Sequence, residues 1–175
     1  MNLKDHIRSI PDYPKKGILF RDITTLIKNE EAFAETINQI IERSKKYKID
    51  KIAAIESRGF VFASAVSYIL KKPFIMLRKK NKLPAAKISQ SFKLEYGTST
   101  MQVHKSSLNK KDKVIIIDDL IATGGTALAA AKLIEKCNAK VSAFLFLIDL
   151  FDLPGNQKLQ SKGYKTYKLI DFPGH

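Results

Sequence analysis

One stretch of the chain limits its fold more than any other. Residues 113–136 read KVIIIDDLIATGGTALAAAKLIEK: an apolar run ends in two carboxylates, a Thr-Gly-Gly-Thr turn follows, and an amphipathic pattern of helical period comes next. A short, continuous apolar run is typical of a strand that is buried on both faces of a sheet. The stretch therefore predicts the strand–turn–helix unit of an α/β protein.

The same scheme recurs along the chain. Residues 30–47 and 61–72 have helical patterns, and further apolar strands are predicted at KIAAIE (51–56), PFIMLR (73–78), KVSAFLFLIDL (140–150) and YKTYKLIDF (164–172). Apolar strands that alternate with helices predict a parallel sheet flanked by helices. With 175 residues, the chain is expected to form one domain, residues 1–175.

Two segments lie outside this alternation. Residues 1–30 are rich in Pro and Gly, and we expect them to form a small N-terminal hood against the sheet. Residues 79–112 are long, polar and basic, with one weakly alternating stretch at SFKLEYG. A connection of this length is usually a lid or a binding loop, so we predict a long flexible lid loop, unless the segment is a disordered insertion.

Charge and cysteine content restrict the partners. The chain has 31 Lys and Arg against 17 Asp and Glu, a net charge of +14, which admits nucleic acid, an anionic membrane or a polyanionic small substrate, unless the lysines simply coat the surface. The single cysteine, Cys137, excludes an internal disulfide and suits a reducing compartment. No apolar stretch is long enough to span a bilayer or to act as a secretory signal, so we expect a soluble cytoplasmic protein with no membrane partner.

The turn after the two acids has the features of a phosphate site. It opens a helix, whose first turn offers unpaired N–H groups and about half a positive charge. Gly124 and Gly125 allow the backbone to approach a phosphate closely, and Thr123 and Thr126 can add hydroxyl donors. Neither a Walker lysine nor a GxGxxG pattern is present, so the nucleotide-binding loops that carry those motifs are not indicated.

The neighbouring acids suggest a sugar. Asp118 and Asp119 are acceptors only, which suits the hydroxyl groups of a sugar or Mg²⁺ with its water shell. A diol at one end and a phosphate at the other describe a ribose 5-phosphate. The alternative is an ordinary strand-to-helix turn with solvated acids.

The segment VIIIDDLIATGGTA resembles the phosphoribosyl-pyrophosphate signature of the type I phosphoribosyltransferases. The segments DYPKKGILFRDIT, ESRGF, RKKNKLP, LEYG and DFPGH extend this resemblance over nearly the whole chain, toward family members that act on adenine. The resemblance implies an α/β fold of the type I phosphoribosyltransferase kind. It also implies transfer of the 5-phosphoribosyl group from phosphoribosyl pyrophosphate to adenine, giving AMP and pyrophosphate, in purine salvage.

The resemblance further implies the substrates, cofactor and assembly. Adenine and phosphoribosyl pyrophosphate are the expected small-molecule partners, Mg²⁺ is expected to arrive bound to phosphoribosyl pyrophosphate with no metal site built from protein side chains, and a homodimer is expected. Asp118 and Asp119 would hold the ribose 2- and 3-hydroxyls. The 5-phosphate would be bound by Ala122, Thr123, Gly124, Gly125 and Thr126.

Two segments are implied in pyrophosphate binding. The residues concerned are Glu56, Ser57, Arg58 and Gly59, with a cis peptide bond at Glu56–Ser57, and Arg78, Lys79 and Lys82 in the second segment. The alternatives are a plain turn with a surface arginine in the first segment and a solvated basic run in the second. Lys80 and Asn81 stand where the family more often has Pro-Gly, which puts the geometry of the second loop in question.

The remaining implied roles concern the base and the reaction. Glu95 would manage a proton of the purine, Tyr96 would exclude water beside the sugar, and Arg58 would complete the catalytic group. Adenine would be bound by Leu19, Phe20 and Arg21, with the Phe20 ring stacked on the purine, although Phe20 could equally belong to the core. Ser99 and Gln102 replace acids that are often found just after the LEYG segment.

Two other functions remain open on the sequence. One is a phosphoribosyltransferase-like regulator that binds RNA or DNA through the positive charge; this is the less favoured reading, because such a protein would have no use for Glu95 or a Phe20 pocket. The other is the same reaction on another purine base, such as hypoxanthine or xanthine, against which the GILFRDIT and LEYG segments argue through resemblance.

Substitution of Glu95 tests the proposed proton role. We expect Glu95→Gln to lower turnover far more than it lowers the affinity for phosphoribosyl pyrophosphate, because the amide can occupy the same place without exchanging a proton. Steady-state kinetics with both substrates varied would separate the two quantities. Equal losses in turnover and affinity would contradict a role in proton transfer.

Overall fold

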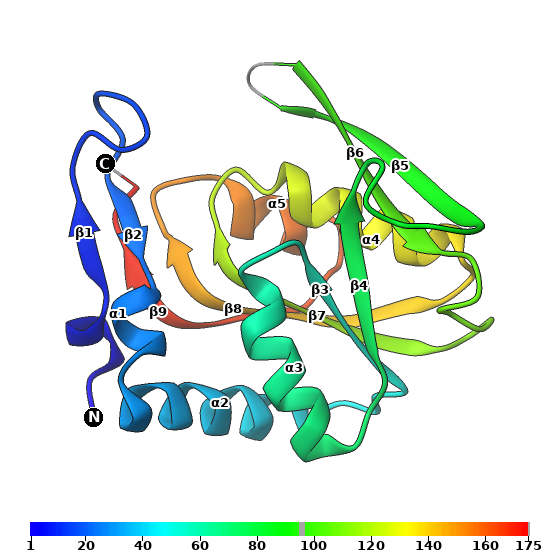
Figure 1. Ribbon diagram of the computed structural model, residues 1–175, viewed down its shortest axis with the longest axis horizontal. Helices are drawn as coiled ribbons and strands as arrows, with labels where there is room; N and C mark the ends of the chain where they lie inside the picture. The colour runs from blue at the N-terminus through cyan, green and yellow to red at the C-terminus, as the bar shows by residue number, and fades with distance from the viewer. Residues whose placement is uncertain (95–96, 175) are drawn as a thin grey trace.

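A computed structural model of the protein describes residues 1–94 and 97–174 (Figure 1). Within this part of the chain the main sheet has seven strands in the order β5-β6-β4-β3-β7-β8-β9. The five strands from β4 to β9 in this order are parallel to one another. Their bounds are Lys51–Ile55 (β3), Phe74–Lys79 (β4), Lys113–Ile121 (β7), Lys140–Leu150 (β8) and Thr166–Phe172 (β9). The predicted parallel sheet is confirmed.

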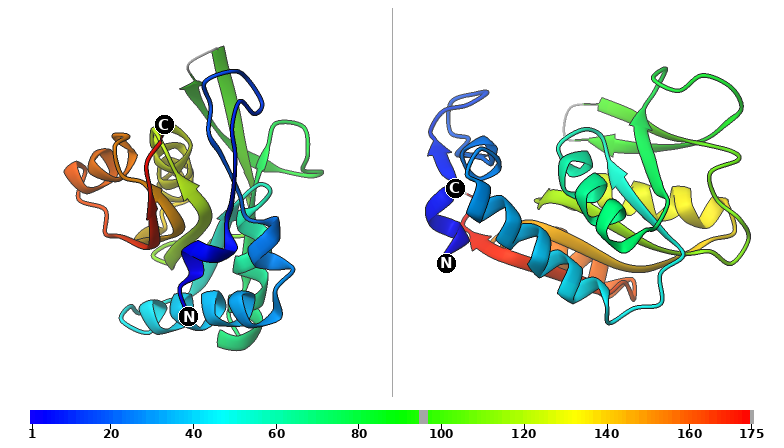
Figure 2. Two further views of the ribbon diagram at one scale, coloured as in Figure 1. Left: turned by 90° about the vertical axis from the view of Figure 1, so that its left-hand side faces the viewer. Right: turned by 60° about the horizontal axis from the view of Figure 1, so that its bottom comes forward.

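Helices cover both faces of this sheet, as Figures 1 and 2 show. Alternate residues of β7 point to opposite sides: Ile115 and Ile117 pack in the core under α2 and α3, whereas Val114 and Ile116 pack in the core under α4 and α5. All four side chains are fully buried, which explains the continuous apolar run in the sequence. The helices are α2 (Glu30–Ser44), α3 (Gly59–Leu70), α4 (Gly125–Lys136) and α5 (Gly155–Ser161).

Local signals explain where α2 begins and which face it buries. The side chain of Asn29 accepts a hydrogen bond from the N–H of Ala32 at 2.9 Å, which caps the first turn. Glu30 and Glu31 follow, where the helix dipole favours negative charge. Ile37, Ile40 and Ile41 recur at helical spacing on the buried face.

The N-terminal segment forms a small second sheet beside the main one. Its strands β1 (Arg8–Ile10) and β2 (Phe20–Asp22) are antiparallel, and the short helices η1 (Leu3–His6) and α1 (Thr24–Ile27) flank them. Figure 1 shows this hood next to the C-terminal end of β9. The expected position of a hood against the sheet agrees with this arrangement.

The segment 79–112 differs from the long loop that we expected. Most of it is a β-hairpin, in which β5 (Lys87–Leu94) pairs antiparallel with β6 (Gly97–His104), and β6 continues the main sheet through two residue pairs with β4. The hairpin stands over the end of the sheet in Figure 1. Its side chains alternate between half-buried and exposed in β5: Ile88 and Phe92 pack against the core under α4, but Gln90, between them on the same face, is polar. This is why its sequence pattern is weak.

The strand order creates a crevice between β3 and β7. These strands are parallel neighbours, yet β3 leads through α3 to β4 on one side, whereas β7 leads through α4 to β8 on the other. Where connections diverge in this way, the carboxyl ends of the two strands open a crevice that is suited to a ligand. The residues after β3 and those at the end of β7 are the two sequence segments that we singled out as functional. No helix in the described ranges is long and apolar enough to cross a membrane.

Candidate active site

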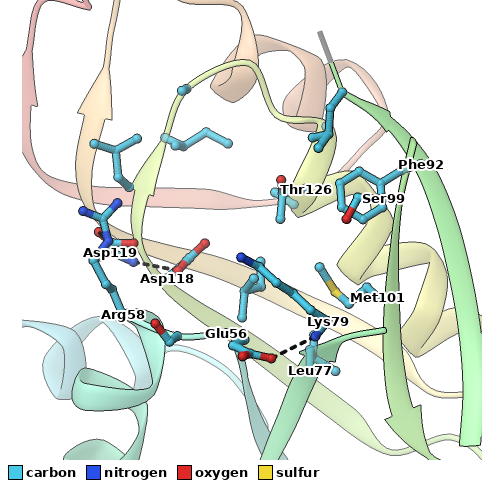
Figure 3. A pocket seen from close by; sticks show the side chains of 18 of the residues that line it. Glu56, Arg58, Leu77, Lys79, Phe92, Ser99, Met101, Asp118, Asp119 and Thr126 are labelled. Atoms are coloured by element: carbon cyan, nitrogen blue, oxygen red, sulfur yellow. Dashed lines mark hydrogen bonds and ion pairs between the residues drawn. The ribbon is translucent and has the colours of Figure 1, made fainter. Parts of the chain in front are cut away.

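A cavity of about 620 Å³ lies over this crevice (Figure 3). The segments that line it are the ends of β3, β4 and β7, the turn that opens α4, the hairpin, and two aromatic residues of the hood. Residues far apart in the sequence, from Tyr13 to Ala127, thus meet around one space.

The two acids of the β7 strand lie side by side in this cavity. Asp119 is 5% exposed, and its N–H donates to Oδ1 of Asp118 at 3.0 Å. Burial and the neighbouring charge of Asp119 raise the pKa of Asp118 well above its usual range. Burial also raises the pKa of Asp119, although the positive charge of Arg58 opposes this shift. Oδ2 of Asp119 is in an ion pair with Nε of Arg58 at 2.9 Å but accepts no well-aligned hydrogen bond from residues 1–94 or 97–174, so this pair has acceptor capacity left for a ligand.

The turn after these acids presents backbone donors. Residues 122–126 all line the cavity, and none of the described residues accepts a hydrogen bond from the N–H groups of Thr123 to Thr126. Helix α4 begins at Gly125 without a side-chain cap, and Gly124 has a φ of +82°, which favours glycine. The turn therefore offers the unpaired amides and the positive helix end that the sequence predicted.

The segment after β3 contains a structural carboxylate. The peptide bond Glu56–Ser57 is cis, as the resemblance implied. Oε2 of Glu56 accepts from the N–H of Lys79 at 2.9 Å and from Nε of Arg78 at 3.3 Å. Burial alone would raise the pKa of Glu56, but these hydrogen bonds and the charges of Arg78 and Lys82 lower it. Glu56 thus joins the end of β3 to the end of β4 as an ionised group.

Packing requires glycine at position 59, in addition to any contact that Gly59 makes with a ligand. A Cβ atom at Gly59 would lie 2.8 Å from Oδ1 of Asp118 and 2.9 Å from the carbonyl oxygen of Ile117. Real Cβ contacts are not this short, so a larger residue would displace the first acid of the pair. Only glycine lets the start of α3 approach the end of β7 so closely.

Arg58 links the acid pair to the hood. Its Nε lies 2.9 Å from Oδ2 of Asp119, in an ion pair, and its guanidinium lies over the Phe20 ring, 5.2 Å from the ring centroid. The Tyr13 ring packs against the same ring in a T-shaped arrangement, at a centroid distance of 5.0 Å. A purine that stacked on the covered face of Phe20 would take the place of the guanidinium. The side chain implied in pyrophosphate binding therefore lies, in this structure, between the sugar acids and the expected base site.

The other predicted residues divide into those that reach the cavity and those that do not. Ser57, Arg78 and Lys79 line it, and Figure 3 shows Lys79 extending into the space. Lys82 does not line it; its carbonyl oxygen instead accepts from Nη1 of Arg78 at 3.4 Å. Among the residues predicted to bind the base, Phe20 lines the cavity, and Leu19 is half-buried just outside it.

The side chain of Arg21 has a structural role. It is buried, donates to Oγ of Ser9 and to the carbonyl oxygen of Pro173 at 2.7 Å, and stacks on the Phe172 ring at 4.4 Å. Its guanidinium thereby ties the hood to the end of the chain. Only the backbone of Arg21 remains available for the predicted contact with a base.

Glu95 and Tyr96 lie outside the described residues, so their predicted roles stay predictions. Other residues of the hairpin that line the cavity were not predicted from the sequence. Phe92, Leu94, Thr100 and Met101 of the hairpin line the cavity, as does Tyr13 from the hood. Figure 3 shows Phe92 and Met101 across the cavity from the two acids. The apolar residues of SFKLEYG at alternate positions were the available signal, but it did not show which face met the site.

Comparison with known proteins assigns this site to a class. The family described as "Phosphoribosyl transferase domain" matches residues 22–173. A curated adenine phosphoribosyltransferase from Pelagibacter ubique is 75% identical over 175 residues, with both chains fully covered. The crystal structure of adenine phosphoribosyltransferase from Thermoanaerobacter pseudethanolicus has a TM-score of 0.93 and 44% identity, covering 97% of this chain and 98% of that one. The Trypanosoma brucei enzyme, solved with AMP, pyrophosphate and ribose-5-phosphate, has a TM-score of 0.88 and 26% identity, covering 97% and 78%.

The fold and the site therefore define a phosphoribosyltransferase of type I. Within that class, the chain belongs to the adenine phosphoribosyltransferase family. Its reaction is the transfer of the 5-phosphoribosyl group from phosphoribosyl pyrophosphate to adenine, which gives AMP and pyrophosphate in purine salvage.

The raised pKa of Asp118 leads to a prediction with opposite effects on stability and binding. The folded state holds the Asp118 proton more tightly than the unfolded state, so ionisation of this group lowers stability as the pH rises above about 4, the usual pKa of Asp. We expect Asp118→Asn to stabilise the ligand-free protein by roughly 1 kcal/mol at pH 8 and by little below pH 4. The same change should weaken phosphoribosyl-pyrophosphate binding about 10- to 100-fold, because a charged acceptor is lost.

Urea unfolding at several pH values and calorimetric titration would measure the two effects of Asp118→Asn. Asp5→Asn is a suitable control, because Asp5 is exposed on η1, away from the cavity, and should change neither quantity. A loss of stability at pH 8 in Asp118→Asn would show that the acid is held by favourable contacts, contrary to this account.

Proposed function

We propose that the transfer takes place in the crevice between β3 and β7, with the acid pair and the phosphate turn binding the two ends of the phosphoribosyl group. One observation carries this proposal: Asp118, Asp119 and the unpaired amides of residues 123–126 line the same cavity. The acids would accept hydrogen bonds from the ribose 2- and 3-hydroxyls. The turn, from Ala122 to Thr126, would hold the 5-phosphate at the start of α4.

The pyrophosphate would lie between the segment after β3 and the end of β4. Arg78 and Lys79 line this side of the cavity with positive charge, and Ser57 and Arg58 line it from the other strand. Glu56 supports this region, because it holds Arg78 and the N–H of Lys79 in place. Charge on the departing pyrophosphate would be neutralised by groups that are already positioned before the bond breaks.

Mg²⁺ fits this site as an ion carried by the substrate. Among the described residues there is no group of three His, Cys, Asp or Glu side chains that could hold a metal by itself. Mg²⁺ takes oxygen ligands and retains several waters, so pyrophosphate oxygens, water and the carboxylate oxygens of the acid pair would provide a suitable ligand set. When bound, the ion would supply positive charge to the leaving group.

Adenine would bind on the hood side, against Phe20. Stacking there requires the Arg58 guanidinium to leave the ring face, and the pyrophosphate provides a competing anion for it. Backbone groups of Leu19 and Arg21 would distinguish the amine of adenine from the carbonyl of hypoxanthine, while Glu95 and Tyr96 would close the site from the hairpin. Wrong bases would leave buried polar groups unpaired.

A panel of bases tests this proposal. With phosphoribosyl pyrophosphate and Mg²⁺, adenine should release pyrophosphate, and hypoxanthine and xanthine should be at least 10²-fold poorer substrates by kcat/KM. A crystal structure with AMP should place the 5-phosphate about 3 Å from the amides of residues 123–126. AMP bound elsewhere would overturn the site, and comparable turnover of hypoxanthine would overturn the role given to the hood.

The proposed site takes small-molecule substrates, and no nucleic-acid partner is needed to explain it. Lysines 45, 46, 48, 71, 72, 110 and 111 are exposed in loops that precede the parallel strands, at the edge of the sheet opposite the cavity. The excess positive charge therefore does not converge on the site, and we propose no nucleic-acid partner. We also propose a cytosolic location, because the single cysteine, Cys137, is a buried free thiol. Tight RNA retention in a filter-binding assay would contradict the proposal about partners.

We further propose a homodimer that forms through the outer face of α3. Val61, Tyr68 and Ile69 lie on one stripe of this helix and are exposed, Tyr68 by 86%. Met76 on β4 points to the same side of the sheet, because its neighbours Ile75 and Leu77 point to the core under α4, and it too is exposed. Several exposed apolar side chains on one side of a sheet are typical of a protein–protein interface.

Tyr68→Lys should dissociate the dimer. A central aromatic residue of an interface often contributes 2 kcal/mol or more, so we expect the dimer dissociation constant to rise about 30-fold or more. Sedimentation velocity over a range of concentrations would measure this. Phe151→Lys is the matched control, because Phe151 is also an exposed aromatic residue, at 58%, but lies beyond the end of β8. Equal dissociation in both variants, or in neither, would exclude the α3 face.

A further inference from the structure

Helix α5 contacts the phosphate turn through the carbonyl groups of the turn. The N–H of Gly155 donates to the carbonyl oxygen of Ala122 at 2.8 Å, and Nζ of Lys158 donates to the carbonyl oxygen of Thr123 at 3.1 Å. Neither residue lines the cavity. Two successive peptide groups of the turn are therefore bonded on their carbonyl side by residues of α5.

These two hydrogen bonds fix the direction of two amides. In a trans peptide group the C=O and N–H bonds point in opposite directions, and the cis bonds in the described ranges are Tyr13–Pro14 and Glu56–Ser57, so both groups of the turn are trans. The carbonyl of Ala122 shares its peptide group with the N–H of Thr123, and the carbonyl of Thr123 shares its group with the N–H of Gly124. With both carbonyls held by α5, the N–H groups of Thr123 and Gly124 point away from α5.

The contact at Gly155 is backbone against backbone. A Cβ at Gly155 would lie 2.3 Å from the carbonyl oxygen of Ala122 and 2.8 Å from the nitrogen of Gly124. Conversely, a Cβ at Gly124 would lie 2.9 Å from Cα of Gly155. No residue other than glycine fits at either position without moving the turn.

The start of α5 is itself anchored to the sheet. Nδ2 of Asn156 donates to Oδ2 of Asp149 at 2.8 Å, and Asp149 is a carboxylate of β8 that is only 2% exposed. Oδ1 of Asn156 accepts from the hydroxyl of Thr166 on β9. The helix that holds the turn is thus tied to two strands of the main sheet.

We propose that Gly155 and Lys158 are positioning residues for the transfer reaction. They hold the carbonyls of Ala122 and Thr123 so that the amides of Thr123 and Gly124 are aimed at the 5-phosphate before it binds. This inference rests on the proposed phosphate site. Without these bonds either peptide group can rotate and present a carbonyl oxygen to the phosphate, which repels it; holding the donors in place in advance removes that alternative.

Lys158→Met and its control give the first test. We expect Lys158→Met to raise KM for phosphoribosyl pyrophosphate about 3- to 10-fold, since a hydrogen bond from a charged group is lost, with kcat and KM for adenine unchanged. Lys158→Arg should restore most of the affinity. Lys162→Met removes the same charge from the exposed end of the same helix, away from the turn, and should leave all constants at wild-type values.

Gly155→Ala gives the second test. Because the added methyl meets the turn itself, KM for phosphoribosyl pyrophosphate should rise at least 10-fold. Gly163→Ala is the control: Gly163 has a φ of +86° but open space around it, so it reports the cost of changing a glycine near α5 without contact with the turn. If Gly155→Ala does not fold, the Lys158 comparison decides the question.

A direct readout separates positioning from general damage. In ¹⁵N-labelled wild-type protein, inorganic phosphate should shift the amide resonances of Thr123 and Gly124, and in Lys158→Met the same shifts should require several-fold more phosphate. Thr126→Val, in the turn itself, marks the phosphate site. If Thr126→Val raises KM for phosphoribosyl pyrophosphate while folded Lys158→Met and Gly155→Ala do not, this inference fails and the phosphate site stands. If none of the three changes KM, the phosphate site itself is wrong.

Discussion

The site depends on the adjacency of two parallel strands whose following helices lie on opposite faces of the sheet. Because α3 covers one side of β3 and α4 covers the other side of β7, the two loops after these strands diverge and leave a crevice between them. The same adjacency brings Gly59 against Asp118, and Arg58 against Asp119. The sugar acids and the segment implied in pyrophosphate binding are neighbours because β3 and β7 pair directly.

The three acids at these strand ends differ in the number of hydrogen-bond donors and positive charges around them. Glu56 receives hydrogen bonds from Lys79 and Arg78, and its pKa falls despite its burial. Asp118 and Asp119 are as confined but share one arginine, and their pKa values rise. A buried carboxylate without enough donors is unfavourable in the free protein and becomes favourable when donors arrive. Glu56 thus serves the frame of the site, whereas the pair keeps its acceptor capacity for ligand hydroxyls. The pair therefore lowers the stability of the free enzyme, and the same lack of donors lets it bind the ligand hydroxyls.

Local sequence signals predicted the parts of the site that one segment builds alone. The strand, acids, glycine turn and helix at residues 113–136 are contiguous, so their order in the sequence is their order in space. The hairpin was not predicted, because on the inward face of β5 the polar Gln90 stands between Ile88 and Phe92 and weakens the apolar alternation in the sequence. The prediction for Arg21 concerned its backbone at the base site and stays a prediction; the structural role of its side chain was not predicted, because its partner Pro173 lies 152 residues away. The contact of Gly155 with Ala122 could not be predicted for the same reason. Pairings between distant segments are set by the fold, and short patterns do not contain them.

The glycines of the site show how two physical requirements combine in one short turn. Gly124 must be glycine for two reasons: its φ is positive, and the backbone of α5 lies directly behind it. At Gly125 the nearest atom to a Cβ would be the carbonyl oxygen of Lys93, at 3.6 Å, an ordinary contact, so α5 and not the hairpin sets the tight limit on the turn. Gly59 and Gly155 have no positive φ, and they are glycines solely because another backbone lies within 3 Å of where a Cβ would be. Close backbone contacts therefore fix the turn on the side of α5 and the acid pair on the side of α3. At the turn and the acid pair, the groups without a hydrogen-bond partner among the described residues, the N–H groups of residues 123–126 and Oδ2 of Asp119, belong to residues that line the cavity, which is the condition for binding an anion and a diol together.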